Sequence, residues 1–404
     1  MLDRSFDNFC KRTENNEIKV VFQMVIGRGG SMLLHSLFDN HPSILAYPGI
    51  LNFYLDIWPA ILKNPEDSST IIETKLVSWV KEMEPYNIGQ YLGDKFDQQI
   101  TIDCKRISRV TVELLNNKFT NSKKTFLAIQ FSIAQQFKTD IENIKVIYCH
   151  EHTSEPDDSL IENIVNDWPS CKILCMLRDP RSNFIAIRNW EEKRIENKMH
   201  ADDGHRYIPG MYAQLCYFWY TRLLRVALKF PKYFVLIRLE DFQRERITML
   251  KHLCDLISIQ YVDSLLQTSF GGMTWHGDNF SPKQAGIRNS ADPKKWQATL
   301  SSFRKGVFEI VLKNEIACLS YPFLYKNNFL IHLYVYLLFP FWFVQDWKRI
   351  FESGYYTYMH QKGFGRLKAL MIAIKSIIGL HIEVNNKSAG RIHEQDVAKL
   401  FFLS

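Results

Sequence analysis

The sequence lacks an uninterrupted run of the roughly 20 apolar residues that a membrane-spanning helix needs. Its apolar stretch at residues 329 to 344 is broken by Pro340, and its first 16 residues are charged and polar. Such a beginning predicts neither a signal peptide nor an N-terminal membrane anchor. Repeats and low-complexity tracts are also missing from residues 18 to 324. We therefore expect a cytoplasmic globular domain over residues 18 to 324, preceded by a polar lead at residues 1 to 17.

A CxxC pair is missing as well. The eight cysteines are scattered, and several lie inside apolar, strand-like runs. Cysteines of this kind are typical of small buried hydrophobic side chains in a reducing compartment. The sequence offers His150 and His152, two residues apart, but no third ligand at a matching spacing, so we expect no metal site.

Residues 20 to 42 contain the most informative pattern of the chain. An apolar run is followed by Gly27-Arg28-Gly29-Gly30-Ser31 and then by a helix-like run that ends at His41-Pro42. Glycines let the backbone approach an anion closely, and the start of a helix offers N–H groups and a partial positive charge. Because no Lys stands before Ser31, the pattern departs from the Gly-Lys-Ser/Thr ending of a nucleoside-triphosphate loop. The sequence predicts a phosphate-binding loop of another kind.

A second strand-like run, residues 171 to 177, ends in Arg178-Asp179-Pro180-Arg181 and passes into a helix. Two strand-to-helix turns that each deliver an Arg suit a ligand with a phosphate at both ends, since open α/β sheets bind ligands along that edge. Helical stretches separate the strand-like runs, as a mostly parallel sheet requires. These runs are residues 20 to 26, 145 to 149, 171 to 177 and 233 to 239.

At this point the chain resembles the sulfotransferases that use 3′-phosphoadenosine-5′-phosphosulfate (PAPS), most closely their bacterial and carbohydrate-type branch. The first segment is similar to the family's 5′-phosphosulfate loop, and the second to its 3′-phosphate motif. Two further segments match in order. These are Ile237-Arg238-Leu239-Glu240-Asp241, and Gly286-Ile287-Arg288 with Trp296 and Leu300. The resemblance covers roughly residues 18 to 324 and implies an α/β, P-loop-like three-layer fold with a central, mostly parallel sheet.

The resemblance also implies roles for single residues. The 5′-phosphosulfate would be wrapped largely by backbone N–H groups, while Arg28 neutralises charge on the bridging oxygen. Arg178 would hold the 3′-phosphate, with Arg288 as a second contact. The residues expected around the 5′-phosphosulfate are Arg28, Gly29, Gly30, Ser31 and Met32.

One departure from the family's pattern affects the 3′-phosphate. Relatives usually carry a Ser eight residues beyond the motif Arg, where this chain has Ala186. Ser182, near the start of the helix, is the candidate replacement.

The acceptor hydroxyl or amine needs a base, and the source we expect is His150-Glu151-His152. His152 aligns best with the family's base, and an unperturbed His suits proton abstraction near neutral pH. Glu151 and His150 remain rivals. In an extended segment His150 and His152 would face the same side. The acceptor pocket is expected in the helical region between residues 50 and 140.

The tail, residues 325 to 404, differs from the rest. It holds ten Lys and Arg against five Asp and Glu, so most of the chain's net charge of +7 lies there. Apolar helices with aromatic and basic flanks suit an anionic membrane surface. We therefore expect a helical apolar appendage that lies on the inner membrane face, packs on the domain, or forms a dimer interface. Nucleic acid is not expected as a partner, because this charge accompanies large aliphatic residues.

The sequence leaves three functions open. The first is PAPS-dependent sulfuryl transfer to a hydroxyl or amine, with a small molecule, a carbohydrate or a lipid-linked glycan as acceptor. The second is a P-loop kinase. The third is a catalytically degenerate nucleotide-binding or membrane-associated protein, suggested by Ala186. The identity of the acceptor and the oligomeric state cannot be derived from the residues.

Overall fold

The computed structural model describes most of the chain up to residue 334 and one short segment near its end. The described residues are 2–83, 91–137, 139–153, 156–196, 209–277, 285–286, 294–325, 328–331, 333–334 and 402–403. The chain divides into two compact units. The first comprises Met1–Leu177, Phe230–Ala291 and Leu400–Ser404, and the second comprises Arg178–Lys229 and Asp292–Lys399.

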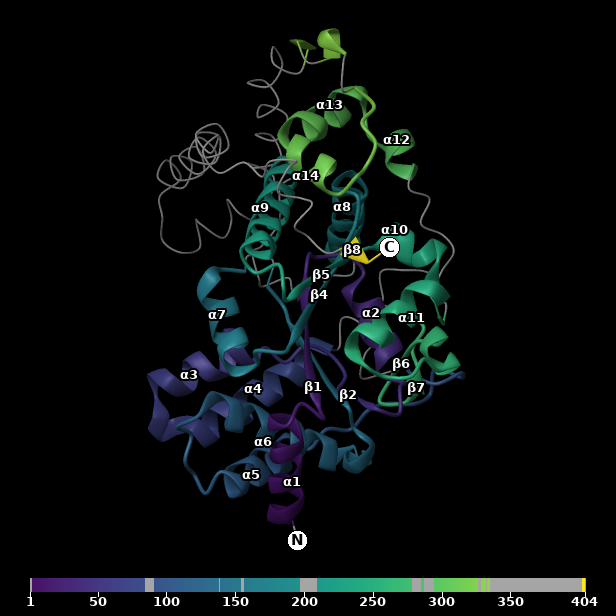
Figure 1. The fold of residues 1–404 in the computed structure, drawn as a ribbon. Helices are drawn as coiled ribbons and strands as arrows, with labels where there is room; N and C mark the ends of the chain where they lie inside the picture. Colours follow the sequence, from purple (N-terminus) through teal and green to yellow (C-terminus); the bar gives the residue numbers. More distant parts are fainter. Residues whose placement is uncertain are drawn as a thin grey trace. The chain divides into compact units, whose positions relative to one another are not determined.

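The first unit is built around a parallel sheet (Figure 1). Its strand order is β2-β3-β1-β4-β5-β8. Every neighbouring pair in this order is parallel. The four strand-like runs of the sequence form β1, β3, β4 and β5, so the predicted α/β fold with a central parallel sheet is confirmed. The strands are β1 (Lys19–Val25), β2 (Ile44–Ala46), β3 (Val146–Glu151), β4 (Lys172–Leu177), β5 (Phe234–Arg238) and β8 (Phe402–Leu403).

Helices cover both faces of this sheet. On one face, Leu34 of α2 (Ser31–Phe38) and Leu253 of α11 (Arg246–Ile257) share an apolar cluster with Val21 and Val235. On the other face, Phe22 contacts Tyr54 of the π-helix η1 and Phe126 of α6. Strand positions that alternate between apolar partners on both sides explain why these strands read as continuous hydrophobic runs. The result is the three-layer arrangement expected from the sequence. The other elements on these layers are η1 (Phe53–Ile57), α6 (Ser122–Gln136), α7 (Asp158–Asp167) and α10 (Leu239–Arg244).

Most of the described residues between 50 and 140 are helical, as predicted. The N-terminal lead also contains a helix, α1, whose Phe6 and Phe9 pack against Phe131 of α6. A small hairpin, β6 with β7, completes the first unit. The remaining elements are α1 (Leu2–Glu14), α3 (Trp58–Lys63), η2 (Pro65–Asp67), α4 (Ser68–Met83), α5 (Cys104–Leu114), η4 (Ile141–Asn143), η5 (Asp263–Leu266), β6 (Ser269–Phe270) and β7 (Met273–Thr274).

The described part of the second unit is helical. Phe184 of α8 packs against Phe308 of α13, with their ring centroids 5.0 Å apart. The chain enters α8 through Pro180, whose fixed φ suits the first helical position. The helices are α8 (Pro180–Glu196), α9 (Pro209–Lys229), α12 (Lys295–Thr299), α13 (Ser302–Val311) and α14 (Lys313–Cys318).

Most of the expected apolar tail, residues 325 to 404, lies outside the described residues. Where the structure describes it, Phe329 and Leu330 are 73% and 74% exposed. Near the end of the chain, β8 adds to the sheet of the first unit by pairing Phe402 with Leu236. No helix within the described part of the chain has the length and apolar character needed to cross a bilayer.

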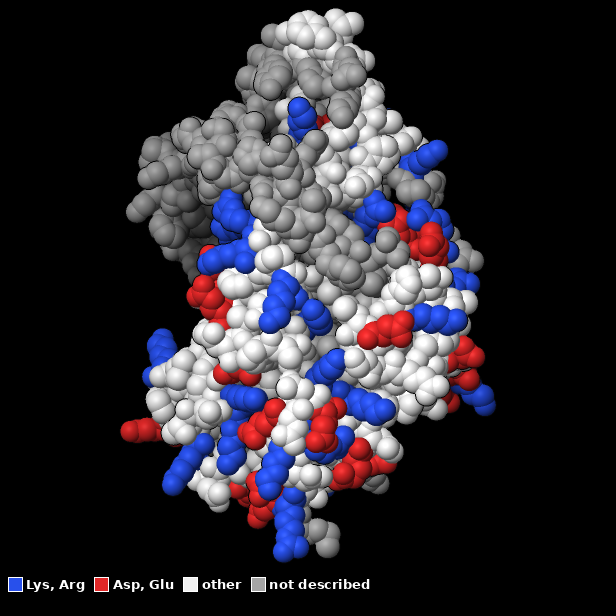
Figure 2. All heavy atoms as spheres, viewed as in Figure 1, with Lys and Arg blue, Asp and Glu red and all other residues white. Residues whose placement is uncertain are grey.

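Acidic and basic side chains are mixed on the visible surface of the first unit (Figure 2). Lys and Arg side chains lie beside Asp and Glu side chains there. A mixed surface of this kind produces weaker long-range fields than a surface of one sign.

Candidate functional site

The order of the strands marks one edge of the sheet as the place for a ligand. From the carboxyl end of β1 the chain continues through α2 to β2 and β3 on one side, whereas from β4 it continues to β5 on the other side. The two strands are direct neighbours, with Val25 opposite Met176. Open α/β sheets bind ligands outside the carboxyl ends of strands at such a switch point. The predicted phosphate loop, Gly27 to Ser31, follows β1 at this edge.

The loop is a tight turn whose backbone conformation requires glycine at position 29. The N–H of Gly29 donates to the carbonyl of Ile26 at 2.9 Å. Arg28 has φ 61°, in the left-handed region that non-glycine residues seldom adopt. A Cβ on Gly29 would lie 2.8 Å from the carbonyl oxygens of both Ile26 and Met176, and Gly30 has φ 100°. Only glycine fits position 29, because the loop backbone lies against the end of β4.

The first turn of α2 presents its backbone N–H groups beside this loop. The first N–H groups of any helix lack partners within the helix, and they attract anions. Gly30 is the residue that caps α2, so no side-chain oxygen of the cap occupies them. Gln23, buried inside β1, donates from Nε2 to the carbonyl of Ser31 at 3.1 Å, and the hydroxyl of Tyr148 donates to its Oε1. The start of α2 is therefore fixed to the sheet by a polar side chain.

Glu151 is the last residue of β3, and its carboxylate binds the backbone at the start of η1. Its carboxylate accepts hydrogen bonds from the backbone N–H groups of Phe53, Tyr54 and Leu55, at 2.9, 3.0 and 3.3 Å. Full burial raises the pKa of Glu151 to about 8, although these three bonds favour its ionised form. Both oxygens thus serve the first turn of η1.

The histidines on either side of Glu151 have different surroundings. His150 is fully buried, and within the described residues neither of its ring nitrogens has a hydrogen-bond partner. Burial lowers its pKa well below the ordinary value, and so do the neighbouring His35 and His152. His152 is exposed, and its backbone N–H donates to Oδ1 of Asn52 at 2.7 Å. The two rings lie 5.8 Å apart, which confirms that both histidines face the same side.

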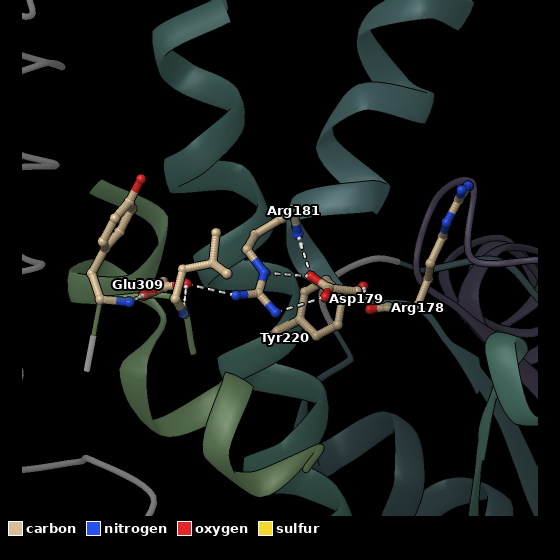
Figure 3. A network of polar contacts seen from close by, with 7 residues as sticks. Arg178, Asp179, Arg181, Tyr220 and Glu309 are labelled. Carbon is tan, nitrogen blue, oxygen red and sulfur yellow. Dashed lines mark hydrogen bonds and ion pairs between the residues drawn. The ribbon is translucent and has the colours of Figure 1, made fainter. Parts of the chain in front are cut away.

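In the second unit, Arg178 directly follows β4 and has its backbone fixed. The hydroxyl of Tyr220 donates to its carbonyl at 2.5 Å. The side chain of Arg178 points away from the polar network beside it (Figure 3). Its Nε is buried and, in the part of the chain that the structure describes, has no hydrogen-bond partner.

The other arginine of the Arg-Asp-Pro-Arg motif is buried in this polar network. Arg181 is 0% exposed and donates to both carboxylate oxygens of Asp179, from Nε at 2.9 Å and from a terminal nitrogen at 2.7 Å. It also donates to Glu309 of α13 at 2.8 Å. Its guanidinium lies over the indole of Trp296, with Cζ 3.9 Å from the ring centroid. Trp296, from the fourth matching segment, therefore contacts the second segment directly.

The remaining predicted residues lie as follows. Ser182 is buried in the first turn of α8, at 4% exposure. Met32 and Ser31 begin α2. Arg288 falls outside the described residues, although its neighbour Gly286 donates its N–H to Thr268 at 2.7 Å.

The roles of three residues on which this arrangement depends were not predicted from the sequence. Gln23 and Glu309 are single polar residues inside the apolar runs VVFQMV and GVFEIV, and such interruptions were the available signal. Arg181 was visible only as part of a motif. Within the described residues, no group of three or more His, Cys, Asp or Glu side chains could hold a metal ion.

Comparisons with known proteins find similarity in structure only. No family model matches the chain, and no curated protein matches its sequence. The sulfotransferase domain from the curacin biosynthetic pathway is 15% identical with a TM-score of 0.45, over 76% of this chain and 99% of that domain. The sulfotransferase domain from the Synechococcus PCC 7002 olefin synthase is 16% identical with a TM-score of 0.43, over 70% and 88%. Sulfotransferase STF1 from Mycobacterium tuberculosis H37Rv is 11% identical with a TM-score of 0.32, over 66% and 74%. All three of these proteins are named as sulfotransferases.

Proposed function

We propose that this chain is a sulfotransferase that moves the sulfuryl group of PAPS to a hydroxyl or amine. The observation that carries the proposal is the loop from Gly27 to Ser31, which opens α2 at the switch point of a parallel sheet. A glycine-containing turn followed by the N-terminus of a helix suits a phosphate or phosphosulfate group. The missing Lys before Ser31 argues against a nucleoside triphosphate.

Arg28 has the charge that the transfer needs. The bond between sulfur and the bridging oxygen breaks while the acceptor oxygen or nitrogen bonds to sulfur, and 3′-phosphoadenosine 5′-phosphate leaves. By analogy with phosphoryl transfer, the transition state is loose and negative charge collects on the leaving oxygen. A guanidinium placed there stabilises this charge more than it stabilises the bound donor. Arg28→Ala should therefore reduce kcat by about 100-fold and change donor affinity little.

The 3′-phosphate is assigned to Arg178, with Ser182 and Arg288 as further contacts. A guanidinium whose Nε has no partner within the described residues suits a charged ligand. A charge-assisted bond to phosphate is worth roughly 1.5–3 kcal/mol, so Arg178→Ala should weaken nucleotide binding at least about tenfold.

His152 is the base that we propose among the three candidates. Glu151 accepts hydrogen bonds from the backbone N–H groups of residues 53 to 55, and His150 is fully buried. The side chain of His152 is exposed at the end of β3, and desolvation lowers its pKa to about 4, so the ring is kept in the neutral form that a base requires. It would take the proton that the attacking hydroxyl or amine must lose.

The acceptor class is proposed from the tail. Phe329 and Leu330 are large exposed apolar residues at the start of the basic tail, and such residues suit a membrane surface. A carbohydrate or lipid-linked glycan at the inner membrane face would then be in reach. Co-sedimentation with anionic liposomes tests this, with Phe329→Ser/Leu330→Ser as the variant and the 60% exposed Leu62→Ser as the control. Equal sedimentation of all three proteins, or none by the unaltered chain, removes the membrane from the proposal.

Transfer of label from ³⁵S-PAPS against label from γ-³²P-ATP tests the reaction itself. Sulfated product with the first donor and none with the second supports the proposal. Phosphorylated product would instead make the chain a P-loop kinase. Binding of 3′-phosphoadenosine 5′-phosphate without transfer to a broad panel of acceptors would make it a degenerate nucleotide-binding protein.

A further inference from the structure

The two arginines of the Arg178-Asp179-Pro180-Arg181 motif are placed for different tasks. The side chain of Arg178 leaves the network, whereas that of Arg181 lies inside it (Figure 3). Arg181 is fully buried and donates hydrogen bonds to Asp179 and Glu309, so a phosphate cannot reach its guanidinium. Removing a buried guanidinium that pairs with two carboxylates leaves these carboxylates buried without a partner and destabilises the surrounding structure.

Asp179 is the acid next to Arg178 in the chain, and Arg181 occupies both of its oxygens. Oδ1 accepts from the backbone N–H and from Nε of Arg181, each at 2.9 Å, and Oδ2 accepts from a terminal nitrogen at 2.7 Å. A carboxylate released from these bonds would be an anion next to Arg178 in the chain and could attract its guanidinium. By holding Asp179, Arg181 keeps the charge of Arg178 available for a ligand.

Glu309 fixes Arg181 in turn and extends the network to the end of the domain. One carboxylate oxygen of Glu309 accepts from Arg181 at 2.8 Å and from the backbone N–H of Leu324 at 2.8 Å. The other accepts from the backbone N–H of Tyr325, also at 2.8 Å. Glu309 is 4% exposed, so these bonds form away from water, where they are strong and costly to break.

We propose that Arg181 and Glu309 are a positioning pair for Arg178. The pair holds the Asp179 carboxylate and the first turn of α8 in place, so that Arg178 meets the 3′-phosphate with its charge uncompensated and its backbone fixed. This inference rests on the proposed function, because it takes Arg178 as the phosphate contact. It adds that residues 324 and 325, where the basic tail begins, are bonded to the phosphate motif through a single carboxylate.

Isothermal titration with 3′-phosphoadenosine 5′-phosphate on the full chain tests the pair. Glu309→Gln keeps the size of the side chain but removes its charge, and it should weaken binding by about five- to tenfold. The matched control is Glu315→Gln in α14, which alters an equally buried Glu that accepts from Thr221 at 2.6 Å. We expect the control to lose stability to a similar degree while its affinity stays at the wild-type value.

A double-mutant cycle separates positioning from general loss of structure. If Glu309 acts through Arg178, Glu309→Gln should weaken binding no further in the Arg178→Ala background. Tyr220→Phe, which removes the bond to the Arg178 carbonyl with little change in volume, is the second variant and should weaken binding in the same non-additive way. Additive effects, or wild-type affinity in Glu309→Gln and Tyr220→Phe, overturn the inference. Failure of the proposed function looks different, because the unaltered chain would then not bind the nucleotide, or Arg178→Ala would bind as well as wild type.

Discussion

Gln23 of β1 and Ser31 of α2 are joined by a hydrogen bond of 3.1 Å from the Gln23 amide to the Ser31 carbonyl. The same amide accepts from the hydroxyl of Tyr148. Burying a side-chain amide inside a strand costs free energy unless its nitrogen and its oxygen both form hydrogen bonds, and in Gln23 both do. Gln23 therefore ties the first turn of α2, where the phosphate loop ends, to two neighbouring strands.

Gln23→Met should lower the free energy of unfolding by about 1–3 kcal/mol, because it leaves the Tyr148 hydroxyl buried without an acceptor. Urea unfolding measures the change. In the double variant Gln23→Met/Tyr148→Phe the orphaned hydroxyl is gone, so the loss should be smaller than the sum of the two single losses. Simple additivity would show that Gln23 and Tyr148 act independently.

Gly29 and Gly272 are both needed as glycines, but for different reasons: Gly29 because a Cβ would clash, and Gly272 because its φ is positive. A Cβ at Gly29 would lie 2.8 Å from two backbone carbonyl oxygens, whereas one at Gly272 would meet nothing within 4 Å. Gly272 instead has φ 74°. We expect Gly29→Ala to destabilise by roughly 2–3 kcal/mol, since backbone cannot yield as a side chain can, and Gly272→Ala by about 1 kcal/mol. Equal losses in urea unfolding would mean that the loop moves freely away from β4.

Substitution of His152 should reduce activity without reducing stability, whereas substitution of Glu151 should reduce stability. His152→Ala should leave nucleotide affinity and the unfolding midpoint near wild type and remove most sulfuryl transfer, about 100-fold or more. Glu151→Gln should lower stability by roughly 1–3 kcal/mol, because an NH2 group replaces one of the two oxygens that accept from the three backbone N–H groups. Initial rates with labelled PAPS, read beside thermal unfolding, separate the two. Full activity in His152→Ala would move the base to Glu151 or His150.

The strands of the sheet could be predicted because their sequences are long apolar runs closed by turn residues. β1, β3, β4 and β5 read directly in this way, and their carboxyl ends located the candidate loops. The two-residue strands of the β6–β7 hairpin are too short to show a period. They depend on Asp39, distant in sequence, whose carboxylate accepts from Ser269 at 2.8 Å and from the N–H groups of Gly271 and Gly272. Local patterns do not contain such a contact.

In the candidate site, too, the features that depend on local geometry could be predicted and those that depend on distant contacts could not. The alternation of side chains along β3 predicted that His150 and His152 share a face, because that depends only on strand geometry. The task of Glu151 could not be predicted, since its partners come from a turn 96 to 98 residues earlier. Likewise, Arg181 and Glu309 are 128 residues apart, and only the fold brings their charges together.

His35 makes stability depend on pH in a way that can be isolated. Its ring is buried between Tyr148, His150 and Phe270, its Nε2 lies 2.8 Å from the carbonyl of Tyr47, and burial lowers its pKa to about 4. The folded chain therefore favours the neutral ring, whereas the unfolded chain takes up a proton near the ordinary pKa of 6.5. The stability that His35 contributes is fully present above pH 6.5 and is lost as the pH falls toward 4.

The test compares the free energy of unfolding of the wild type with that of His35→Phe. The difference between them should shift by about 2 kcal/mol against the wild type between about pH 7.5 and about pH 5. Taking the difference removes the opposing contribution of Glu151, whose raised pKa makes the fold more stable as the pH falls from 8 toward 4.5. His252→Gln, at an exposed histidine of α11, is the control and should track the wild type. A difference that stays constant with pH would show that the His35 ring takes up its proton as readily in the fold as in the unfolded chain.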